Sequence, residues 1–427
     1  MANKTNADIF IAGLGALSAI GNDVAECLYA LEDRQAGISG ITYLETVHRQ
    51  QLPVAEVKLS NEELASRAGV SSKISRTALL SLLAAREALN NAGLGAGSGR
   101  AVTGTGSDRG SFAGGSVLGN RSPWRTGFIS ANTVGGMDKT ERFFADFLSD
   151  PLKGKLRDTI QHECGSITEW VADQLHIHDY LTTISTACSS SANAIFFGAR
   201  LIRHGMLDVV VAGGTDALTK FTLNGFNTLM ILDQQYCKPF DENRKGLNLG
   251  EGAGYVVLVS ARVAASLRTE LVCRLSGYCN ANDAYHQTAS SPDGTGSYLA
   301  MKGALERSGL QPSDIGYINL HGTGTQNNDI AEGTAIRRLF DPQYPPMSST
   351  KSFTGHTLGA CGGLEAVFSA LSVQRGLIYP NLRFETPMKE LPFTPATTFM
   401  KDQPVQHVLS NSFGFGGNCS SLIFSKL

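Results

Sequence analysis

One cysteine, two histidines and one lysine lie in short segments that are rich in small residues. Cys188 lies in STACSSSAN, His321 begins HGTGT, and Lys351 and His356 stand five residues apart in STKSFTGH. A cysteine thiolate can accept an acyl group and form a covalent intermediate. Two neutral imidazoles can donate N–H groups to a thioester oxygen that becomes negatively charged. This set of residues therefore suits a reaction that loads an acyl group onto cysteine and then joins it to a carbanion.

The residues around Cys188 place it at a turn between a strand and a helix. The run LTTIS before it resembles a strand, whereas Ala192, Ile195 and Ala199 after it recur at helical spacing. A thiol at such a turn lies at the positive end of a helix dipole, which favours the thiolate. A lone cysteine is more often a buried core residue, and a lone histidine is more often structural. The combination carries the interpretation, not any single residue.

A glycine-rich segment near the C-terminus offers a further part of such a site. It reads SNSFGFGGNC over residues 410–419. Glycine permits positive φ and close approach of the backbone. Backbone N–H groups in a turn of this kind can hold the oxyanion that forms when an acyl-cysteine is attacked.

Short apolar runs alternate with helix-period stretches along the whole chain, which indicates an α/β architecture with buried strands. No low-complexity linker divides the chain, and the best candidate for a boundary between two halves is Ser260–Leu271. We predict strands at Ile9–Ala12, Val209–Ala212, Tyr255–Val259, Tyr317–Leu320 and Leu422–Phe424, and helices at Ser75–Asn91, Ser189–His204 and Gly362–Arg375.

The bulk composition is that of a globular enzyme. The chain has 427 residues, 42% of them hydrophobic and 17% charged, and its formal net charge of −2 gives no reason to expect a nucleic-acid partner. No apolar run approaches the about 20 residues that span a bilayer, and no signal peptide is evident. The eight cysteines are scattered without a C-x-x-C pair, which is typical of reduced thiols. We therefore expect a cytoplasmic protein.

The four motifs, taken together and in this order, resemble those of the β-ketoacyl-acyl-carrier-protein synthases of the thiolase superfamily. The match is closest to the elongating type of fatty acid and type II polyketide synthesis, and it covers most of the chain. The resemblance implies a thiolase-like five-layer αβαβα fold with two pseudo-symmetric halves. We place these halves at 1–265 and 266–427. It also implies a decarboxylative Claisen condensation of an acyl thioester with malonyl-acyl-carrier protein.

The resemblance also implies a role for each matched residue. Cys188 resembles the acyl-accepting nucleophile, His321 and His356 the decarboxylation pair, and Lys351 the lysine that tunes the second histidine. Thr323 and Thr325 resemble threonines that bind the phosphopantetheine arm. Phe415 resembles the gating phenylalanine with Phe413 as its packing neighbour, and the backbone N–H groups of Phe415 and Cys188 resemble the oxyanion hole.

The resemblance further implies which groups bind and which do not. The acyl carrier protein is the expected partner and carries the phosphopantetheine, so no cofactor or metal of the chain's own is expected. A homodimer is usual, and a heterodimer with a related synthase-like subunit is the alternative. Glu332 and Glu365 match acidic positions that support the histidines or a bound ion. His176 and His178 could be metal ligands, but no further cluster accompanies them.

Three regions bear on specificity. Ser111–Glu163 does not match the usual synthase pattern and leaves chain length and partner choice open. Gly417-Asn418-Cys419 replaces the more common Gly-Thr-Asn, which favours a specialised branch such as aryl polyene synthesis. Basic Arg67, Lys73 and Arg76 precede a helix that in relatives receives the acidic carrier protein, and they equally suit a solvated helix start.

Two other functions remain as alternatives. A non-condensing chain-length factor resembles a synthase throughout but lacks the active cysteine, whereas Cys188 is present here. Another acyltransferase of the same fold, such as a thiolase, pairs its nucleophile with a second catalytic cysteine, and Cys419 does not lie in a matching motif. Initiating synthases use Cys-His-Asn and fit less well, because the second imidazole here is His356.

Overall fold

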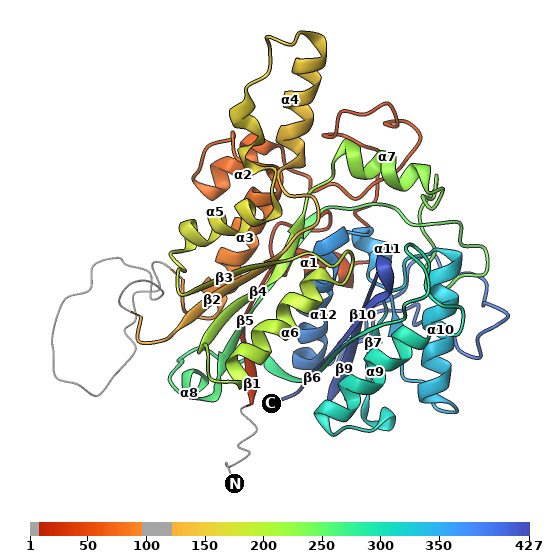
Figure 1. Ribbon diagram of the computed structural model, residues 1–427. Coiled ribbons are helices and arrows are strands. Elements are labelled where there is room, and N and C mark those ends of the chain that lie inside the picture. The colour runs from red at the N-terminus through yellow and green to blue at the C-terminus, as the bar shows by residue number, and fades with distance from the viewer. Residues whose placement is uncertain (1–7, 96–121) are drawn as a thin grey trace, which may run out of the picture.

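The computed structural model describes residues 8–95 and 122–427. Within these residues the strands form one ten-stranded sheet in the order β3-β2-β4-β5-β1-β6-β10-β9-β7-β8 (Figure 1). The strands are β1 (Ile9–Ser18), β2 (Thr126–Ala131), β3 (Tyr180–Ile184), β4 (Val209–Asp216), β5 (Gly252–Ser260), β6 (Cys273–Asn282), β7 (Tyr317–Asn319), β8 (Met347–Ser348), β9 (His407–Gly414) and β10 (Asn418–Ser425).

The two halves of the sheet repeat one topology. From its outer edge inward, each half has its third, second, fourth, fifth and first strand in that order. In each half the second strand pairs parallel with its two neighbours, and the remaining pairs are antiparallel. The halves join where β1 and β6 pair through Phe10 with Arg274 and Ile11 with Cys273. This repeat is the pseudo-symmetry expected of a thiolase-like fold.

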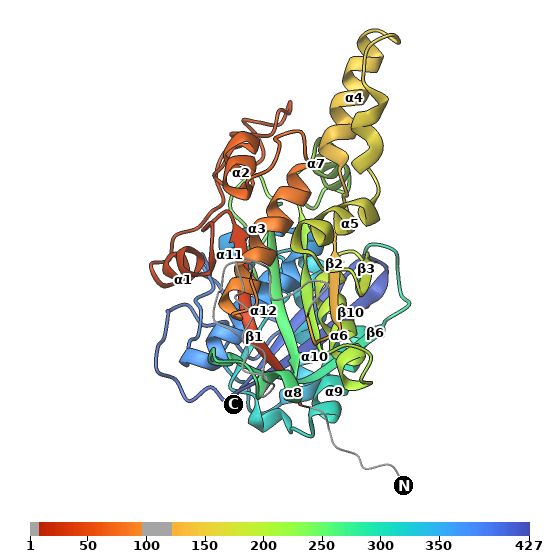
Figure 2. The ribbon, with the colours of Figure 1, turned by 90° about the vertical axis from the view of Figure 1, so that its left-hand side faces the viewer.

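Helices form layers on both faces of each half-sheet. Helices α6 and α12 lie between the half-sheets, α3 and α5 cover the outer face of the first, and α9 and α10 cover that of the second (Figures 1 and 2). The fold is therefore the expected five-layer αβαβα arrangement. The helices are α1 (Val24–Glu32), α2 (Asn61–Ala68), α3 (Arg76–Asn91), α4 (Met137–Ser149), α5 (Cys164–Leu175), α6 (Ser190–Arg203), α7 (Lys220–Thr228), α8 (Ala261–Ala264), α9 (Thr295–Ser308), α10 (Gln326–Phe340), α11 (Lys351–Thr354) and α12 (Cys361–Arg375), with short 3-10 turns η1 (Leu156–Gln161), η2 (Pro312–Asp314), η3 (Leu358–Ala360) and η4 (Phe415–Gly417).

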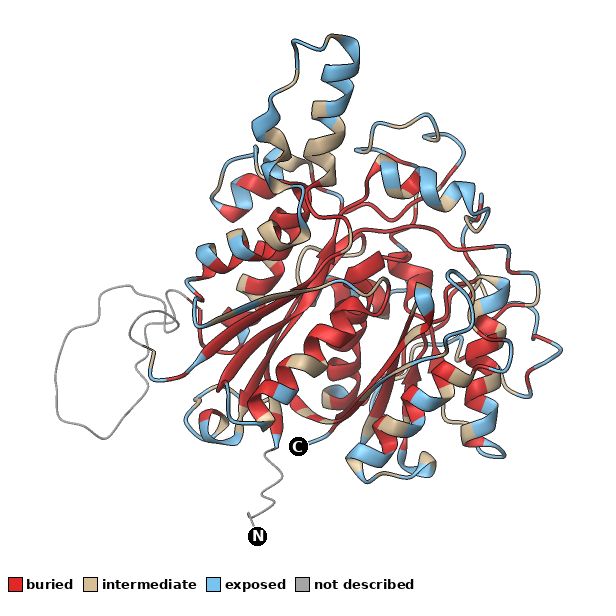
Figure 3. Cartoon of the chain, viewed as in Figure 1, coloured by how far each residue is buried: buried red, intermediate tan, exposed pale blue. Residues whose placement is uncertain are grey.

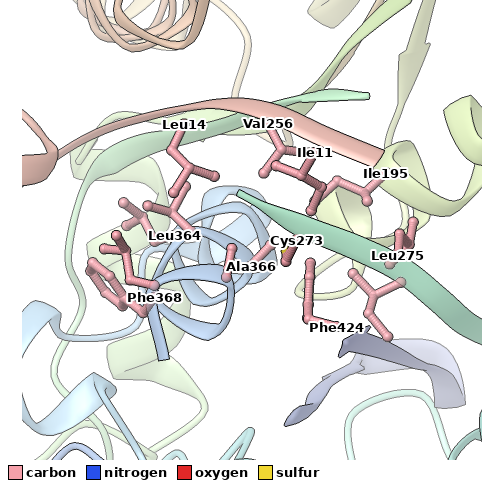
Figure 4. Close-up of a cluster of buried hydrophobic side chains, with 14 of the residues drawn as sticks. Ile11, Leu14, Ile195, Val256, Cys273, Leu275, Leu364, Ala366, Phe368 and Phe424 are labelled. Carbon is pink, nitrogen blue, oxygen red and sulfur yellow. The ribbon is translucent and has the colours of Figure 1, made fainter. Parts of the chain in front are cut away.

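The largest apolar cluster fills the space between the half-sheets, where α6 and α12 are buried (Figures 3 and 4). Figure 4 shows Leu14 of β1 beside Leu364 of α12, and Val256 of β5 beside Ile11 of β1. Helix α12 approaches β5 so closely that only glycine fits at position 254. A Cβ added to Gly254 would lie 2.3 Å from the Leu364 nitrogen. This packing fixes the two central helices, and the starts of both helices lie at the site.

One element stands clear of these layers. Helix α4 and the turn η1 form a hairpin that projects from the body in Figures 1 and 2, and α4 has no buried residue. The hairpin falls in the segment 111–163 that did not match the synthase pattern; residues 111–121 lie outside the described residues. Among the residues that the structure describes, no helix has both the length and the apolar character needed to cross a membrane.

Candidate active site

Cys188 lies at the turn between β3 and α6, as the sequence predicts. The turn is strained, because Ala187 has a φ of 52° although it is not glycine. The Ser190 hydroxyl donates to the Ala187 carbonyl at 2.5 Å and holds this conformation. Such strain persists only where surrounding contacts fix it, and it recurs at functional sites. The turn presents the Cys188 thiol, which is only 5% exposed, to a cavity.

Burial dominates the electrostatics of this thiol. It raises the pKa of Cys188 to about 11, although the Lys351 ammonium and the backbone N–H groups of Phe415 and Cys188 lower it. From the sequence we expected the helix end to favour the thiolate. Burial outweighs the helix end and these donors, so Cys188 is a thiol at neutral pH in the resting site. The two N–H groups nevertheless converge on the sulfur, which is the position required of an oxyanion hole for a carbonyl bound there.

His321 and His356 face each other with ring centroids 5.6 Å apart and planes at 88°. The Nδ1 atom of His356 accepts the Leu358 backbone N–H at 3.0 Å, and the Lys351 ammonium lies 3.2 Å from Nδ1 of His321. With Nδ1 acting as acceptor in both rings, the proton of each neutral imidazole is on Nε2. Burial and then Lys351 lower the pKa of His356 to about 3 and that of His321 well below its usual value.

Lys351 is buried and supports the histidines from behind the cavity. Its ammonium donates to the His321 carbonyl at 2.7 Å and forms a short ion pair with Glu365. Burial alone would lower the pKa of Lys351, but the Glu365 carboxylate raises it above its usual value, so the side chain stays charged. The resemblance led us to expect that this lysine tunes the second histidine electrostatically, and its charge does lower the pKa of His356. Its hydrogen bond, however, is made to the first histidine, His321, whose pKa it lowers as well.

Glu332 positions the backbone at His321. Its carboxylate accepts the backbone N–H groups of His321 at 2.9 Å and of Gly322 at 2.8 Å, and the Asn411 amide at 3.0 Å. This agrees with the structural role expected from the sequence for Glu332, and the bond to Lys351 agrees with that expected for Glu365.

The glycine-rich segment forms a hairpin, β9–η4–β10, whose loop covers Cys188. A Cβ on Gly414 would lie 2.9 Å from the Thr186 carbonyl oxygen and 3.1 Å from the Cys188 nitrogen, so only glycine allows this approach. The Phe415 ring stacks on Phe226 of α7, with centroids 5.8 Å apart. Phe413 was expected to pack on Phe415, but its ring contact is with His321, at 5.8 Å.

One cavity of about 360 Å³ brings most of the expected residues together. Thr323 and Thr325 lie on its wall with their hydroxyl oxygens 2.9 Å apart. Lys351 is the exception, because it lies behind the wall. The predicted site residues that line the cavity are Cys188, His321, Thr323, Thr325, His356, Phe413 and Phe415.

Three residues of the site were missed by sequence reasoning. Phe226 carries no motif that would mark it. Cys361, whose thiol donates to the Cys188 carbonyl at 3.1 Å, stands five residues after His356 and could have been noticed from that spacing. Asn418 was noted only as a departure from the usual loop; its side-chain oxygen accepts the Ser189 hydroxyl at 2.8 Å.

In the part of the chain that the structure describes, two groups of His, Cys, Asp or Glu side chains have ligand atoms within 4.8 Å of one another: Cys188, His321 and His356, and His321, Cys361 and Glu365. In the second group the Lys351 ammonium already bonds both His321 and Glu365, so it occupies the place of a cation. His176 and His178 are both exposed and belong to neither group.

The basic residues before α3 do not form one surface patch. Arg76 is only 7% exposed, and its guanidinium bonds both oxygens of Glu251 at 2.6–3.0 Å. It links α3 to the start of β5 and is not available to a partner, so its assignment to a docking patch is wrong. Arg67 and Lys73 are exposed.

The layered fold and a cysteine–histidine–histidine cavity define a condensing enzyme of the thiolase-like class. Comparison with known families places the chain further. Residues 6–264 match the N-terminal domain of β-ketoacyl synthases, and residues 272–385 match their C-terminal domain. The chain belongs to the β-ketoacyl synthase family and is an acyltransferase that condenses acyl units, a ketosynthase.

Individual relatives agree with this placement. The chain is 32% identical to 3-oxoacyl-[acyl-carrier-protein] synthase 2 of Staphylococcus aureus (strain N315), over 99% of each chain. Among solved structures, it resembles the ishigamide ketosynthase/chain length factor with a TM-score of 0.88, at 26% identity over 99% of this chain and 100% of that one. A complex of a ketosynthase with its chain length factor from Xenorhabdus doucetiae gives a TM-score of 0.80, at 28% identity over the whole of both chains.

Proposed function

We propose that the chain catalyses decarboxylative condensation of an acyl thioester with malonyl-acyl-carrier protein, with Cys188 as the nucleophile. The observation that carries the proposal is the convergence of the Cys188, His321 and His356 ligand atoms within 4.8 Å of one another in one cavity. A non-condensing chain length factor would not need this set.

In the loading step, the Cys188 sulfur attacks the thioester carbonyl of the donor. A bond from sulfur to the acyl carbon forms, the bond to the pantetheine sulfur breaks, and that thiol leaves with the proton of Cys188. The N–H groups of Phe415 and Cys188 hold the oxyanion of the tetrahedral intermediate, since both already reach this sulfur.

In the second step, malonyl thioester loses its carboxylate as carbon dioxide and the electron pair passes to an enolate. The Nε2–H groups of His321 and His356 donate to the enolate oxygen, because Nδ1 of each ring is engaged as an acceptor. The enolate carbon then attacks the acyl-cysteine carbonyl. The carbon–sulfur bond to Cys188 breaks, and the thiolate takes up a proton.

The substrates reach the site on an acyl carrier protein, in fatty acid or type II polyketide synthesis, and a cytoplasmic location suits this supply. The phosphopantetheine arm belongs to that carrier, so the chain needs no cofactor or metal of its own. Thr323 and Thr325, with neighbouring hydroxyls on the cavity wall, suit hydrogen bonds to the arm. The exposed Arg67 and Lys73 suit an acidic carrier surface.

We also propose that the chain forms a homodimer. The projecting hairpin exposes apolar side chains, among them Leu148 at 68% and Leu152 at 96%. Its turn η1 packs on α5 and α5 packs on β3, whose outer edge has no neighbouring strand among the described residues. An edge strand beside apolar surface favours pairing with another subunit. A related synthase-like subunit is the alternative occupant.

Intact-protein mass spectrometry with a panel of acyl-carrier-protein thioesters tests the proposal. The wild-type chain should gain one acyl group, and Cys188→Ala should gain none. Cys279→Ala is the matched control, because Cys279 is more accessible and lies outside the cavity; it should load normally. Loading of Cys188→Ala, or no loading of the wild type by any donor, would contradict the proposal, and the latter would favour the partner-subunit function.

A further inference from the structure

The side-chain oxygen of Asn418 is the meeting point of a partly buried polar network. Three donors converge on it: the Ser189 hydroxyl at 2.8 Å, the Asn193 amide at 2.9 Å and the Asn280 amide at 2.7 Å. A carbonyl oxygen has two lone pairs, so three donors more than saturate it, and the Ser189 hydroxyl shares its one proton between this oxygen and the Thr186 carbonyl, also at 2.8 Å. Ser189 and Asn193 belong to the start of α6 in the first half of the chain, and Asn280 belongs to β6 in the second half. Asn418 therefore links the two halves.

Asn418 lies at the base of the loop that covers the nucleophile. It is the first residue of β10 and stands opposite Gly414 in the β9–β10 register, so the two residues close the loop Phe415–Gly417. Ser189 directly follows Cys188 in the chain. One hydrogen bond therefore ties the base of the loop to the nucleophile turn.

The loop base touches the backbone of that turn, so small displacements matter. A Cβ on Gly414 would lie 3.1 Å from the Cys188 nitrogen and 3.3 Å from the Ser189 nitrogen. The N–H groups of Phe415, in the loop, and of Cys188, in the turn, both reach the same sulfur. Their spacing depends on how the loop is held against the turn.

The two histidines are held by other groups. His321 is fixed by Lys351 and Glu332, and His356 by the Leu358 N–H. None of these hydrogen bonds involves Asn418. Asn418 itself therefore bonds groups around the sulfur and none that holds an imidazole, although Asn411 and Phe413 of the neighbouring strand β9 contact Glu332 and His321.

We propose that Asn418 is a positioning residue for the acyl-transfer steps, which fixes the spacing between the Phe415 and Cys188 N–H donors and leaves malonyl decarboxylation unaffected. The inference rests on the proposed function, since it assumes acyl transfer to Cys188.

The test compares Asn418→Leu with Asn418→Thr and with a matched control, Asn91→Leu. Asn91 is the last residue of α3, and its amide makes one hydrogen bond, to the Leu14 carbonyl, outside the cavity. Each full-length variant is assayed for the rate of Cys188 acylation by quenched mass spectrometry. Carbon dioxide release from malonyl-acyl-carrier protein without an acyl donor is measured separately, together with the thermal midpoint.

Asn418→Leu should slow acylation about 10- to 100-fold, less than the about 10²–10³-fold expected when an oxyanion donor is removed, because the N–H groups are displaced and not lost. Its decarboxylation rate should stay within about twofold of wild type, and Asn418→Thr, which keeps an acceptor for Ser189, should recover part of the acylation rate. Asn91→Leu should change neither rate.

Normal acylation by Asn418→Leu would overturn the inference, and so would an equal loss in both half-reactions, which marks a purely structural role. If Asn418→Leu does not fold, the inference is tested with Asn418→Thr, by comparing its loss in acylation rate with its loss in decarboxylation rate. Loading of Cys188→Ala would instead show that the proposed function fails.

Discussion

At the scale of single residues, hydrogen-bond partners set the protonation of the reacting groups. The Leu358 N–H and the Lys351 ammonium each engage one Nδ1, which leaves both Nε2 atoms as donors. Burial keeps the imidazoles neutral and the Cys188 thiol protonated. The two half-reactions should therefore depend on pH in different ways.

The first prediction follows from those pKa values. Because burial raises the pKa of Cys188 to about 11, the thiolate fraction increases about tenfold per pH unit below that value. Acylation should therefore accelerate from pH 6 to pH 9. His356 has a pKa of about 3, so decarboxylation should lose nothing to imidazole protonation down to about pH 5. Rates of each half-reaction across pH 5–9 check this, and a decarboxylation limb near pH 6.5 would contradict it.

The second prediction separates stability from chemistry at Lys351. Lys351→Met leaves Glu365 buried without its partner, which should cost about 3–5 kcal/mol of unfolding free energy. The double variant Lys351→Met/Glu365→Leu should regain most of that stability, because apolar pairs often replace buried ion pairs without loss. It should still decarboxylate slowly, since His321 lacks the donor at Nδ1.

Denaturant unfolding and carbon dioxide release measure the two effects of these lysine variants. Normal decarboxylation by the double variant would show that Lys351 only stabilises the fold.

At the scale of elements, the third prediction concerns the closeness of β9 to the nucleophile turn. Gly414→Ala should push the loop off the turn, because its Cβ would lie 2.9 Å from the Thr186 oxygen. Since a misplacement of about 1 Å can cost about 10²-fold in rate, a shift of a few tenths of an ångström should slow acylation about three- to tenfold.

Gly165→Ala is the matched control for this loop variant. Gly165 lies in α5 with nothing within 4 Å of the added Cβ. It should raise the unfolding free energy by a few tenths to about 1 kcal/mol and leave acylation unchanged. Equal acylation by both alanine variants would show that the loop base has room to move.

Local patterns were enough to predict the elements that carry the nucleophile and the histidines. The predicted helix Ser189–His204 is α6 with both caps included, the predicted strand Tyr317–Leu320 before His321 is β7, and the predicted helix Gly362–Arg375 after His356 is α12. The contacts of Phe226 and Asn418 were not predictable, because they join segments about 190 and 230 residues apart in the chain, and no local spacing signals such a pairing. The burial of Arg76 was not predicted for a related reason. A charged residue at the start of a helix is expected to be exposed to solvent unless its ion-pair partner, here Glu251, is known.

At the scale of the whole molecule, the fourth prediction concerns carrier docking. Lys73 is exposed before α3, whereas its neighbour Arg76 is buried in an ion pair. Lys73→Glu should raise the KM for the acyl carrier protein several-fold at low salt, and the effect should fade at about 1 M salt, where the Debye length is about 3 Å. Arg268→Glu, an exposed charge in the connection between the halves, is the control. Equal KM values for both variants would place the carrier elsewhere.

The fifth prediction concerns the projecting hairpin, because its Leu148 and Leu152 side chains are largely exposed in the single chain. Burying a leucine side chain contributes about 1.5–3 kcal/mol, so Leu148→Ser/Leu152→Ser should weaken self-association at least about 100-fold. Leu299→Ser, on α9 of the other half and 44% exposed, should leave it unchanged. Sedimentation over a range of concentrations measures both.

Two outcomes of that sedimentation experiment would contradict this prediction: the first would exclude the homodimer, and the second would exclude only the hairpin as its interface. If the wild-type chain stays monomeric at micromolar concentration, the hairpin is expected to bind a related subunit instead. Co-expression with such a subunit should then yield a heterodimer, which Leu148→Ser/Leu152→Ser should disrupt. A double variant that dimerises as tightly as wild type would instead place the interface at the β3 edge alone, because the pairing of backbone N–H and C=O groups there does not depend on Leu148 or Leu152.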